Sequence, residues 1–117
     1  MIQLSACLIV KNEATLLPRC LESIRSFVDE IIVVDTGSND KTVEIAHSYG
    51  AQIYHFAWVD DFSAARNESL QHAKGEWILY IDADEAIDAV NAAKIREIIT
   101  RKDIMAVTIR QCIPQPA

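Results

Sequence analysis

The sequence of 117 residues contains few residues that interrupt regular structure, with three glycines and three prolines. Its hydrophobic share of 50% and charged share of 24% are typical of a packed globular domain and exclude a fibrous or disordered chain. Gly37 is too isolated for a dinucleotide fingerprint or a phosphate-binding P-loop. A chain of this length buries roughly two thirds of its unfolded surface around one core, so we expect a single domain over residues 1–117.

Cysteine is scarce as well, and Cys7, Cys20 and Cys112 are odd in number and widely spaced. This spacing indicates neither a disulfide framework nor a Cys-x-x-Cys metal site, so we expect reduced, buried thiols. The amino terminus lacks a basic segment, and its apolar run Ala6–Val10 is far shorter than the roughly twenty residues of a membrane span. We therefore expect a cytoplasmic protein without a transmembrane segment.

The histidines and tryptophans show no arrangement that indicates a site. His47, His55 and His72 share no metal-binding spacing and have no serine or cysteine placed for nucleophilic catalysis, so we expect structural or exposed side chains. Trp58 and Trp77 adjoin predicted strand ends, and we expect them in the core or its wall.

Positive charge is outnumbered, with 11 basic against 17 acidic side chains and a net charge of −6. The resulting field repels nucleic acid and anionic membrane surfaces, which excludes nucleic acid as an expected partner. A small phosphorylated ligand can still bind if placed arginines or a metal ion supply a local positive charge.

Alternating strand and helix patterns fill the chain. The predicted strands are Leu4–Val10, Ile31–Val34, Gln52–Trp58, Trp77–Ile81 and Met105–Ile113. Apolar residues at helical spacing occupy Leu16–Phe27, Thr42–Tyr49, Phe62–Leu70 and Ile95–Ile99. Such alternation with short connections predicts a three-layer, Rossmann-like α/β fold, with helices on both faces of a mainly parallel sheet.

Polar residues at the helix ends agree with this division. Ser38 or Asp40 is placed to cap the second helix, and Pro18 suits the first turn of the first. Gly50 and Gly75 are expected where the second and third helices end.

Ligands of parallel sheets bind at the carboxyl ends of the strands, where the loops converge. Polar segments follow four of the predicted strands at residues 11–13, 35–38, 60–61 and 82–85. The sequence therefore predicts that four loops bring carboxylates to one edge of the sheet.

Asp82 and Asp84 follow the strand Trp77–Ile81. In an extended segment, residues two apart face the same way, so both carboxylates can enter one cleft while Ala83 packs behind them. Two hard oxygen ligands suit Mg²⁺ or Mn²⁺, which leave their other positions to water and substrate phosphates. The alternative is that both are solvated loop acids; their position after a buried strand, beside three other acidic loops, favours the metal site.

Asp35 and Arg66 are two further candidates. Asp35 follows an apolar strand and can accept a hydrogen bond from a ribose hydroxyl or a base N–H, or it can brace the turn and cap the next helix. Arg66 lies on a predicted helix that begins at the same edge and can clamp a diphosphate, brace Asp35, or be a surface arginine.

Four segments taken together resemble family 2 glycosyltransferases of the A-type fold. They are Cys7–Glu13, Ile31–Thr42, Trp58–Asn67 and Gly75–Glu85, and they occur in the family's order. The resemblance implies a nucleotide-sugar-binding half with a D-x-D motif, a UDP-linked donor, and Mg²⁺ or Mn²⁺. By the same resemblance, Glu13 and Asp35 contact the nucleoside, Arg66 lies near the base or diphosphate, Asp82 touches the ribose and Asp84 holds the metal.

The implied reaction is sugar transfer with inversion at the anomeric carbon. Family members usually continue beyond the D-x-D strand with an acceptor site and a catalytic base, and no residue here matches that base. Glu85 and Asp88 follow the metal motif too directly to be assigned as the base. We therefore expect a truncated domain, with an exposed sheet edge that favours self-association.

Two alternatives remain open at this stage. The chain can be a non-catalytic module that binds nucleotide sugars or protein partners. It can also be a phosphotransfer enzyme that uses D-x-D as nucleophile and acid, although that class of haloacid-dehalogenase-like enzymes has the motif on its first strand.

Overall fold

The computed structural model of the chain describes residues 3–100 and the backbone of residues 112–114. Strands and helices alternate in the order β1 (Leu4–Val10), α1 (Leu17–Ile24), β2 (Glu30–Asp35), α2 (Thr42–Ser48), β3 (Gln52–His55), α3 (Phe62–His72), β4 (Trp77–Tyr80), α4 (Ala89–Ile98) and β5 (Cys112–Pro114). The strands form one sheet in the order β3-β2-β1-β4-β5. Strands β1 to β4 are parallel, and β5 pairs antiparallel with β4.

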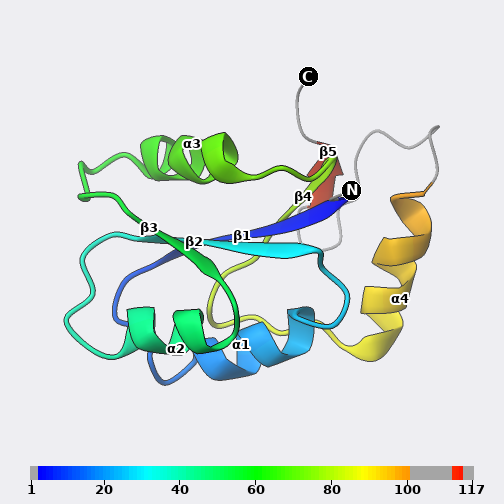
Figure 1. The fold of residues 1–117 in the computed structure, drawn as a ribbon, viewed down its shortest axis with the longest axis horizontal. Helices are drawn as coiled ribbons and strands as arrows, with labels where there is room; N and C mark the ends of the chain where they lie inside the picture. Colours follow the sequence, from blue (N-terminus) through cyan, green and yellow to red (C-terminus); the bar gives the residue numbers. More distant parts are fainter. Residues whose placement is uncertain (1–2, 101–111, 115–117) are drawn as a thin grey trace.

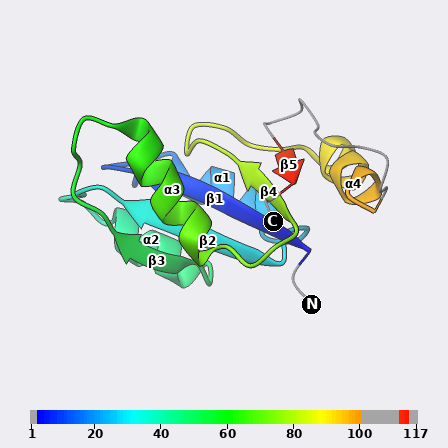
Figure 2. The same cartoon turned by 90° about the horizontal axis from the view of Figure 1, so that it is seen from above.

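Helices cover both faces of this sheet. Helix α3 lies on one face, and helices α1 and α2 lie on the other (Figure 1). Seen from above, α3 crosses β1 and β2, while α4 lies beside the β4–β5 side of the sheet (Figure 2). The predicted three-layer α/β fold is therefore confirmed. From β1 the sheet extends through β2 and β3 on one side and through β4 and β5 on the other. Ligands of such sheets bind at the carboxyl ends of the strands where this change of direction occurs, between β1 and β4.

The larger core lies between the sheet and helices α1, α2 and α4. Leu4, Leu8 and Val10 of β1 meet Leu17 and Leu21 of α1, and none of these side chains is more than 1% exposed. Burying each such side chain stabilises the fold by roughly 1.5–3 kcal/mol. A smaller core under α3 consists of Cys7, Ile32, Ala73 and Ile78.

Helix α3 faces the sheet mainly with small side chains. Its buried residues are Ala65 and Ser69, and Leu70 packs partly buried against the smaller core. Near its end, His72 stacks on Tyr54 of β3 with ring centroids 3.5 Å apart, and His72 Nε2 lies 2.6 Å from Glu68 Oε2. Aromatic and polar contacts thus add to the packing of Leu70 in holding this helix, which is the one that carries Arg66.

Strand β3 ends earlier than the sequence predicts, at His55 instead of Trp58. Its neighbour β2 ends at Asp35, which pairs with His55, so the ladder stops after Phe56 N donates to Asp35 O at 2.9 Å. Strand length here depends on the partner strand and not on the local apolar run. The expectation for Trp58 fails for the same reason, because it lies in the loop beyond β3 and is 43% exposed.

Most other sequence predictions hold where the structure describes them. Strands β1, β2 and β4 agree to within one residue at each end, and the thiols of Cys7 and Cys20 are free and buried. Of the predicted strand Met105–Ile113, residues 105–111 lie outside the described residues. In the part of the chain that is described, no helix combines the length and apolarity needed to cross a membrane.

Two of the predicted helix ends are confirmed and one is refined. Pro18 lies in the first turn of α1, and Gly50 follows α2 with a φ of +81°, which favours glycine. Asp40 precedes α2, and its carboxylate accepts hydrogen bonds from the N–H (2.9 Å) and the hydroxyl of Thr42. Ser38 contacts Asp35 instead.

Gly75 does not end α3, which is a correction. The helix ends at His72, and its C-cap residue is Ala73. A Cβ placed on Gly75 would lie 2.6 Å from Ser5 Oγ and 2.7 Å from Ser5 N. Glycine is required here because the chain passes too close to β1 for any side chain.

The amino ends of the parallel strands are joined by a buried polar network that we call the amino-edge network. Glu30 is 8% exposed and accepts hydrogen bonds from Ser5 Oγ (2.5 Å), Lys74 N (2.6 Å) and Gln52 Nε2 (3.1 Å). Ser5 Oγ also accepts from Gly75 N at 2.8 Å. Sequence patterns gave no sign of this network, because its members come from four separate segments.

Candidate functional site

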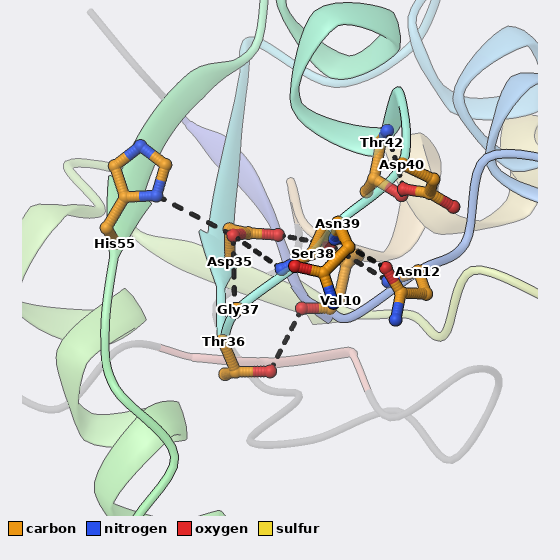
Figure 3. Close-up of polar contacts among 10 residues, drawn as sticks. All are labelled: Val10, Asn12, Asp35, Thr36, Gly37, Ser38, Asn39, Asp40, Thr42 and His55. Atoms are coloured by element: carbon orange, nitrogen blue, oxygen red, sulfur yellow. Dashed lines mark hydrogen bonds and ion pairs between the residues drawn. The ribbon is translucent and has the colours of Figure 1, made fainter.

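The loops after β1 and β2 are bonded to each other at the carboxyl edge of the sheet (Figure 3). Asn12 has a φ of 54°; its N–H donates to Ser38 Oγ (2.9 Å), and its side-chain oxygen accepts from Asn39 N (2.7 Å). Glu13 N donates to Thr42 Oγ1 at 2.8 Å. The two loops therefore form one surface, and the predicted site residue Glu13 is half-buried within it.

Asp35 braces the turn that follows β2. Its carboxylate accepts hydrogen bonds from Gly37 N (3.3 Å), Ser38 N (3.2 Å) and Ser38 Oγ (2.5 Å), and the residue is 4% exposed. These contacts confirm the bracing alternative. They also fix the position and direction of the carboxylate before any ligand arrives.

His55 lies beside Asp35, with Nδ1 3.6 Å from Oδ2, and its own side chain is 72% exposed (Figure 3). Sequence patterns do not indicate His55 as a site residue, because only the pairing of β3 with β2 brings it beside Asp35. A hollow of about 250 Å³ opens here, lined by Asp35, Gly37, His55, Phe56 and Ala57. The hollow is large enough for a flat organic ring, with a carboxylate and an imidazole at its wall.

The acidic segment 60–61 has a mainly structural role. Asp61 caps α3, since its carboxylate accepts from Ser63 N (2.9 Å) and Ala64 N (3.3 Å). Asp60 has a φ of 57° and accepts from the Trp58 indole N–H at 2.9 Å. One of the four predicted acidic loops is thus explained without a ligand.

Arg66 and Asp82 line one narrow crevice on the α3 side of the sheet. The crevice is lined by Cys7, Ile9, Phe62, Arg66, Ser69, Tyr80, Ile81 and Asp82. The guanidinium carbon of Arg66 lies 4.4 Å from the ring centroid of Tyr80 and 5.3 Å from that of Phe62. The structure therefore groups Arg66 with Asp82, whereas Asp35 has His55 as its neighbour.

The D-x-D segment is a tight turn and not an extended strand, which corrects the predicted geometry. Glu85 N donates to Asp82 O (2.9 Å), and Asp82 N donates to Glu85 Oε1 (3.0 Å). Asp82 and Asp84 are nevertheless both exposed while Ala83 is 5% exposed. Both carboxylates thus face outward with Ala83 packed behind them.

The electrostatic setting of Asp82 favours a cation. Partial burial raises the pKa of its carboxyl, the neighbouring carboxylates of Glu85 and Asp84 raise it further, and Arg66 opposes them. Within residues 3–100, no three histidine, cysteine, aspartate or glutamate side chains form a ready metal cage. The carboxylates of Asp82 and Asp84 fit Mg²⁺ or Mn²⁺, which are commonly bound through one or two carboxylates plus water and phosphate.

Helix α1 supports the D-x-D turn from the opposite face of the sheet. Cys20 Sγ donates to Asp82 O at 3.5 Å, and Ser23 Oγ accepts from Ile87 N at 3.1 Å. Burial raises the pKa of Cys20 to about 12, so its thiol keeps the proton that it donates. The predicted buried thiol therefore has a supporting contact at the site.

The five predicted site residues do not line one pocket. Arg66 and Asp82 share the crevice, Asp35 lines the hollow, and Glu13 and Asp84 lie on the neighbouring loops. Val10 pairs with Asp35 and Cys7 pairs with Tyr80, so β1 separates the two openings at one edge of the sheet.

Comparison with known proteins gives a family match over nearly the whole chain. The model of the family described as Glycosyl transferase family 2 matches residues 5–115. A TPR repeat-containing protein of Synechococcus elongatus is 48% identical over 93% of the chain. The chain spans about a quarter of that relative's length, at 27%.

Solved structures show the same fold. S. aureus TarS (residues 1–349) superposes with a TM-score of 0.75 at 23% identity, covering 85% of this chain and 32% of that one. Glucosyl-3-phosphoglycerate synthase from Mycobacterium tuberculosis, in complex with Mn²⁺, UDP and glucosyl-3-phosphoglycerate, superposes with a TM-score of 0.63 at 25% identity, covering 73% of this chain and 36% of that one.

Proposed function

The chain belongs to glycosyl transferase family 2, and from that premise we propose that the carboxyl edge of its sheet binds a nucleoside-diphosphate sugar. The observation that carries the proposal is the grouping of Arg66 and Asp82 in one crevice, with Asp84 on the same turn as Asp82. An acidic protein needs local positive charge for a diphosphate. Arg66 supplies part of it, and a metal ion held at the turn supplies the rest.

We assign the nucleoside to the hollow beside Asp35. An ionised carboxylate has about four lone-pair sites, and the contacts described for Asp35 with Gly37 and Ser38 are three. It can therefore accept one more hydrogen bond, from a base N–H or a ribose hydroxyl. Glu13 borders the same surface, and Asp82 is assigned to the ribose. A uridine nucleotide is favoured because the similar M. tuberculosis enzyme was crystallised with UDP.

Asp84 is the residue assigned to hold Mg²⁺ or Mn²⁺. Its carboxylate is exposed on the turn, and the crowding of Asp82 by Glu85 and Asp84 is a charge arrangement that a divalent cation relieves. The M. tuberculosis enzyme contains Mn²⁺ together with UDP. When bound, such an ion neutralises charge on the departing diphosphate.

The proposed reaction is inverting transfer, in which an acceptor hydroxyl attacks the anomeric carbon on the face opposite the diphosphate. This chain's residues bind and orient the donor, with Arg66 at the diphosphate and Asp35 at the nucleoside. We assign no catalytic base, so donor binding and transfer are separate parts of the proposal. A nucleotide-sugar-binding module without transfer is the second candidate, favoured by that unassigned base.

Calorimetric titration of the full chain with UDP in the presence of Mn²⁺ tests the donor site. Replacing Asp84 with asparagine should weaken binding by about tenfold or more, because even supporting residues of metal sites typically contribute that much. Glu97→Gln, on the exposed face of α4, is the matched control and should bind like the original chain. Equal affinity without Mn²⁺ or with Asp84→Asn would remove the assigned metal role. If the chain hydrolyses the donor or transfers its sugar, the second candidate, a binding module without transfer, is excluded.

A further inference from the structure

The Arg66 guanidinium lies over two aromatic rings that come from different elements. Tyr80 is the last residue of β4, and Phe62 is the first residue of α3, one helical turn before Arg66. The guanidinium carbon lies 4.4 Å from the Tyr80 ring centroid and 5.3 Å from the Phe62 ring centroid. Both separations are within the roughly 6 Å range of a cation–π contact, and the shorter one belongs to Tyr80.

The two rings differ in how firmly they are fixed. Tyr80 is half-buried, packs against the smaller core, and has its backbone paired with Cys7 of β1. Phe62 is 47% exposed at the start of a helix. The sheet therefore fixes the Tyr80 ring, whereas the position of the Phe62 ring depends on α3 alone.

An arginine that lies over an aromatic ring keeps its hydrogen-bonding capacity. The ring attracts the positive charge electrostatically and uses none of the N–H donors of the guanidinium, which match the oxygen atoms of a phosphate. A long side chain that is already ordered loses less conformational freedom when it binds, so the contact favours ligand affinity.

We propose that Tyr80 is a positioning residue, whose ring holds the Arg66 guanidinium in the crevice beside Asp82 so that the diphosphate of the donor meets an ordered arginine. The inference rests on the proposed donor site and extends it to a ring that acts through Arg66. The Tyr80 hydroxyl has no part in this role. The ring alone is required.

A double-mutant cycle tests the inference through UDP affinity measured with Mn²⁺ on the full chain. Tyr80→Phe keeps the ring and should bind within about twofold of the original chain, whereas Tyr80→Leu should bind about five- to tenfold more weakly, as expected for loss of a partly desolvated cation–π contact. In an Arg66→Ala background, Tyr80→Leu should change the affinity by less than about twofold, because the two residues act as a unit.

Tyr49→Leu is the matched control. Tyr49 is also a partly buried tyrosine with an arginine over its ring, but it packs against the larger core, and its partner is Arg25, 5.6 Å from the ring centroid, and not Arg66. Tyr49→Leu should lower the thermal unfolding temperature about as much as Tyr80→Leu does while leaving UDP affinity unchanged. If Tyr80→Leu weakens UDP binding equally with and without Arg66, Tyr80 supports only the fold and the inference is overturned.

A second readout needs no ligand. The NMR resonance of the Arg66 Nε–H group should show a ring-current shift in the original chain and in Tyr80→Phe, and that shift should largely disappear in Tyr80→Leu. An unchanged resonance in folded Tyr80→Leu would overturn the inference at any donor affinity. If the original chain binds no UDP with Mn²⁺ while the resonance behaves as expected, the donor site fails and the Tyr80 contact stands.

Discussion

The two edges of the sheet use carboxylates in opposite ways. At the amino edge, Glu30 is buried and its oxygens accept hydrogen bonds from three other segments of the chain. At the carboxyl edge, Asp82 and Asp84 are exposed on one turn, and partial burial, together with the carboxylates of Glu85 and Asp84, raises the pKa of Asp82. A carboxylate whose partners are all internal stabilises the fold, whereas carboxylates that crowd one another at a surface favour a cation from outside. Substitutions at the two edges should therefore separate stability from ligand binding.

The largest effect is expected from Gly75→Ala at the amino edge. The added Cβ would lie 2.6 Å from Ser5 Oγ and 2.7 Å from Ser5 N, and a backbone atom cannot move aside cheaply. We expect a loss of about 3 kcal/mol in the free energy of unfolding, measured by urea denaturation. Gly50→Ala is the control: it meets no atom within 4 Å and should cost only about 1 kcal/mol for its positive φ. Equal losses would mean that close packing at the amino edge is unimportant.

Glu30→Gln is expected to have the next largest effect. The amide replaces one acceptor oxygen with a donor, so one of the N–H or O–H groups that now face Glu30 loses its partner inside the protein. Leaving a buried polar group unsatisfied costs about 1–3 kcal/mol, and we expect about 2 kcal/mol by urea denaturation. UDP affinity of the folded variant should not change. A change in affinity without a loss of stability would contradict the division between the edges.

Asp29→Asn should have a smaller effect that depends on pH. Partial burial raises the pKa of Asp29, but the N–H groups of Leu4 and Gln3 and the Arg96 guanidinium together lower it below its ordinary value. A lowered pKa in the folded state stabilises the protein above the ordinary value, and that stability is lost as the pH falls through the lowered one. With the discount for solvent screening, we expect a loss of about 1 kcal/mol at neutral pH. The difference between the two proteins should shrink as the pH falls below the ordinary aspartate pKa of about 3.9, and a difference independent of pH would contradict this account.

Asp82→Asn should have the smallest effect on stability. It removes one of the crowded charges at the carboxyl edge, so the free energy of unfolding should change by no more than about 0.5 kcal/mol. Set beside Glu30→Gln, this is the same chemical change at the opposite edge. For ligand affinity the two variants should rank the other way round. In calorimetric titration with UDP and Mn²⁺, Asp82→Asn should lower the affinity and Glu30→Gln should leave it unchanged. A stability loss as large as that of Glu30→Gln would show that Asp82 belongs to the fold.

The sequence predicts those features that depend on local pattern. Apolar runs and helical spacing locate the strands and helices, and a carboxylate directly after a strand is correctly placed at the carboxyl edge. The end of β3 is mispredicted because it depends on where β2 ends. Gly75 follows a helix and so has the position of a capping residue, whereas its actual constraint is Ser5, 70 residues away.

The same limit applies within the site. The sequence indicates Asp35 and Asp82 because each follows an apolar strand. It does not indicate His55 or Tyr80, because their importance comes from contacts with Asp35 and with Arg66 on other elements. Side-chain contacts between elements distant in sequence leave no periodic pattern in a single sequence.

The two tryptophans place one intrinsic fluorophore at each edge. Trp77 begins β4 at the amino edge and is 6% exposed, so its emission should lie at short wavelength and shift to the red on unfolding. Trp58 is 43% exposed, directly follows Ala57 of the hollow beside Asp35, and its indole N–H donates to Asp60. Its emission should lie at longer wavelength and respond to an occupant of the hollow. Trp77→Phe would leave Trp58 as an optical reporter of ligand binding. Trp58→Phe would leave Trp77 as a reporter of folding, and neither variant needs an attached dye.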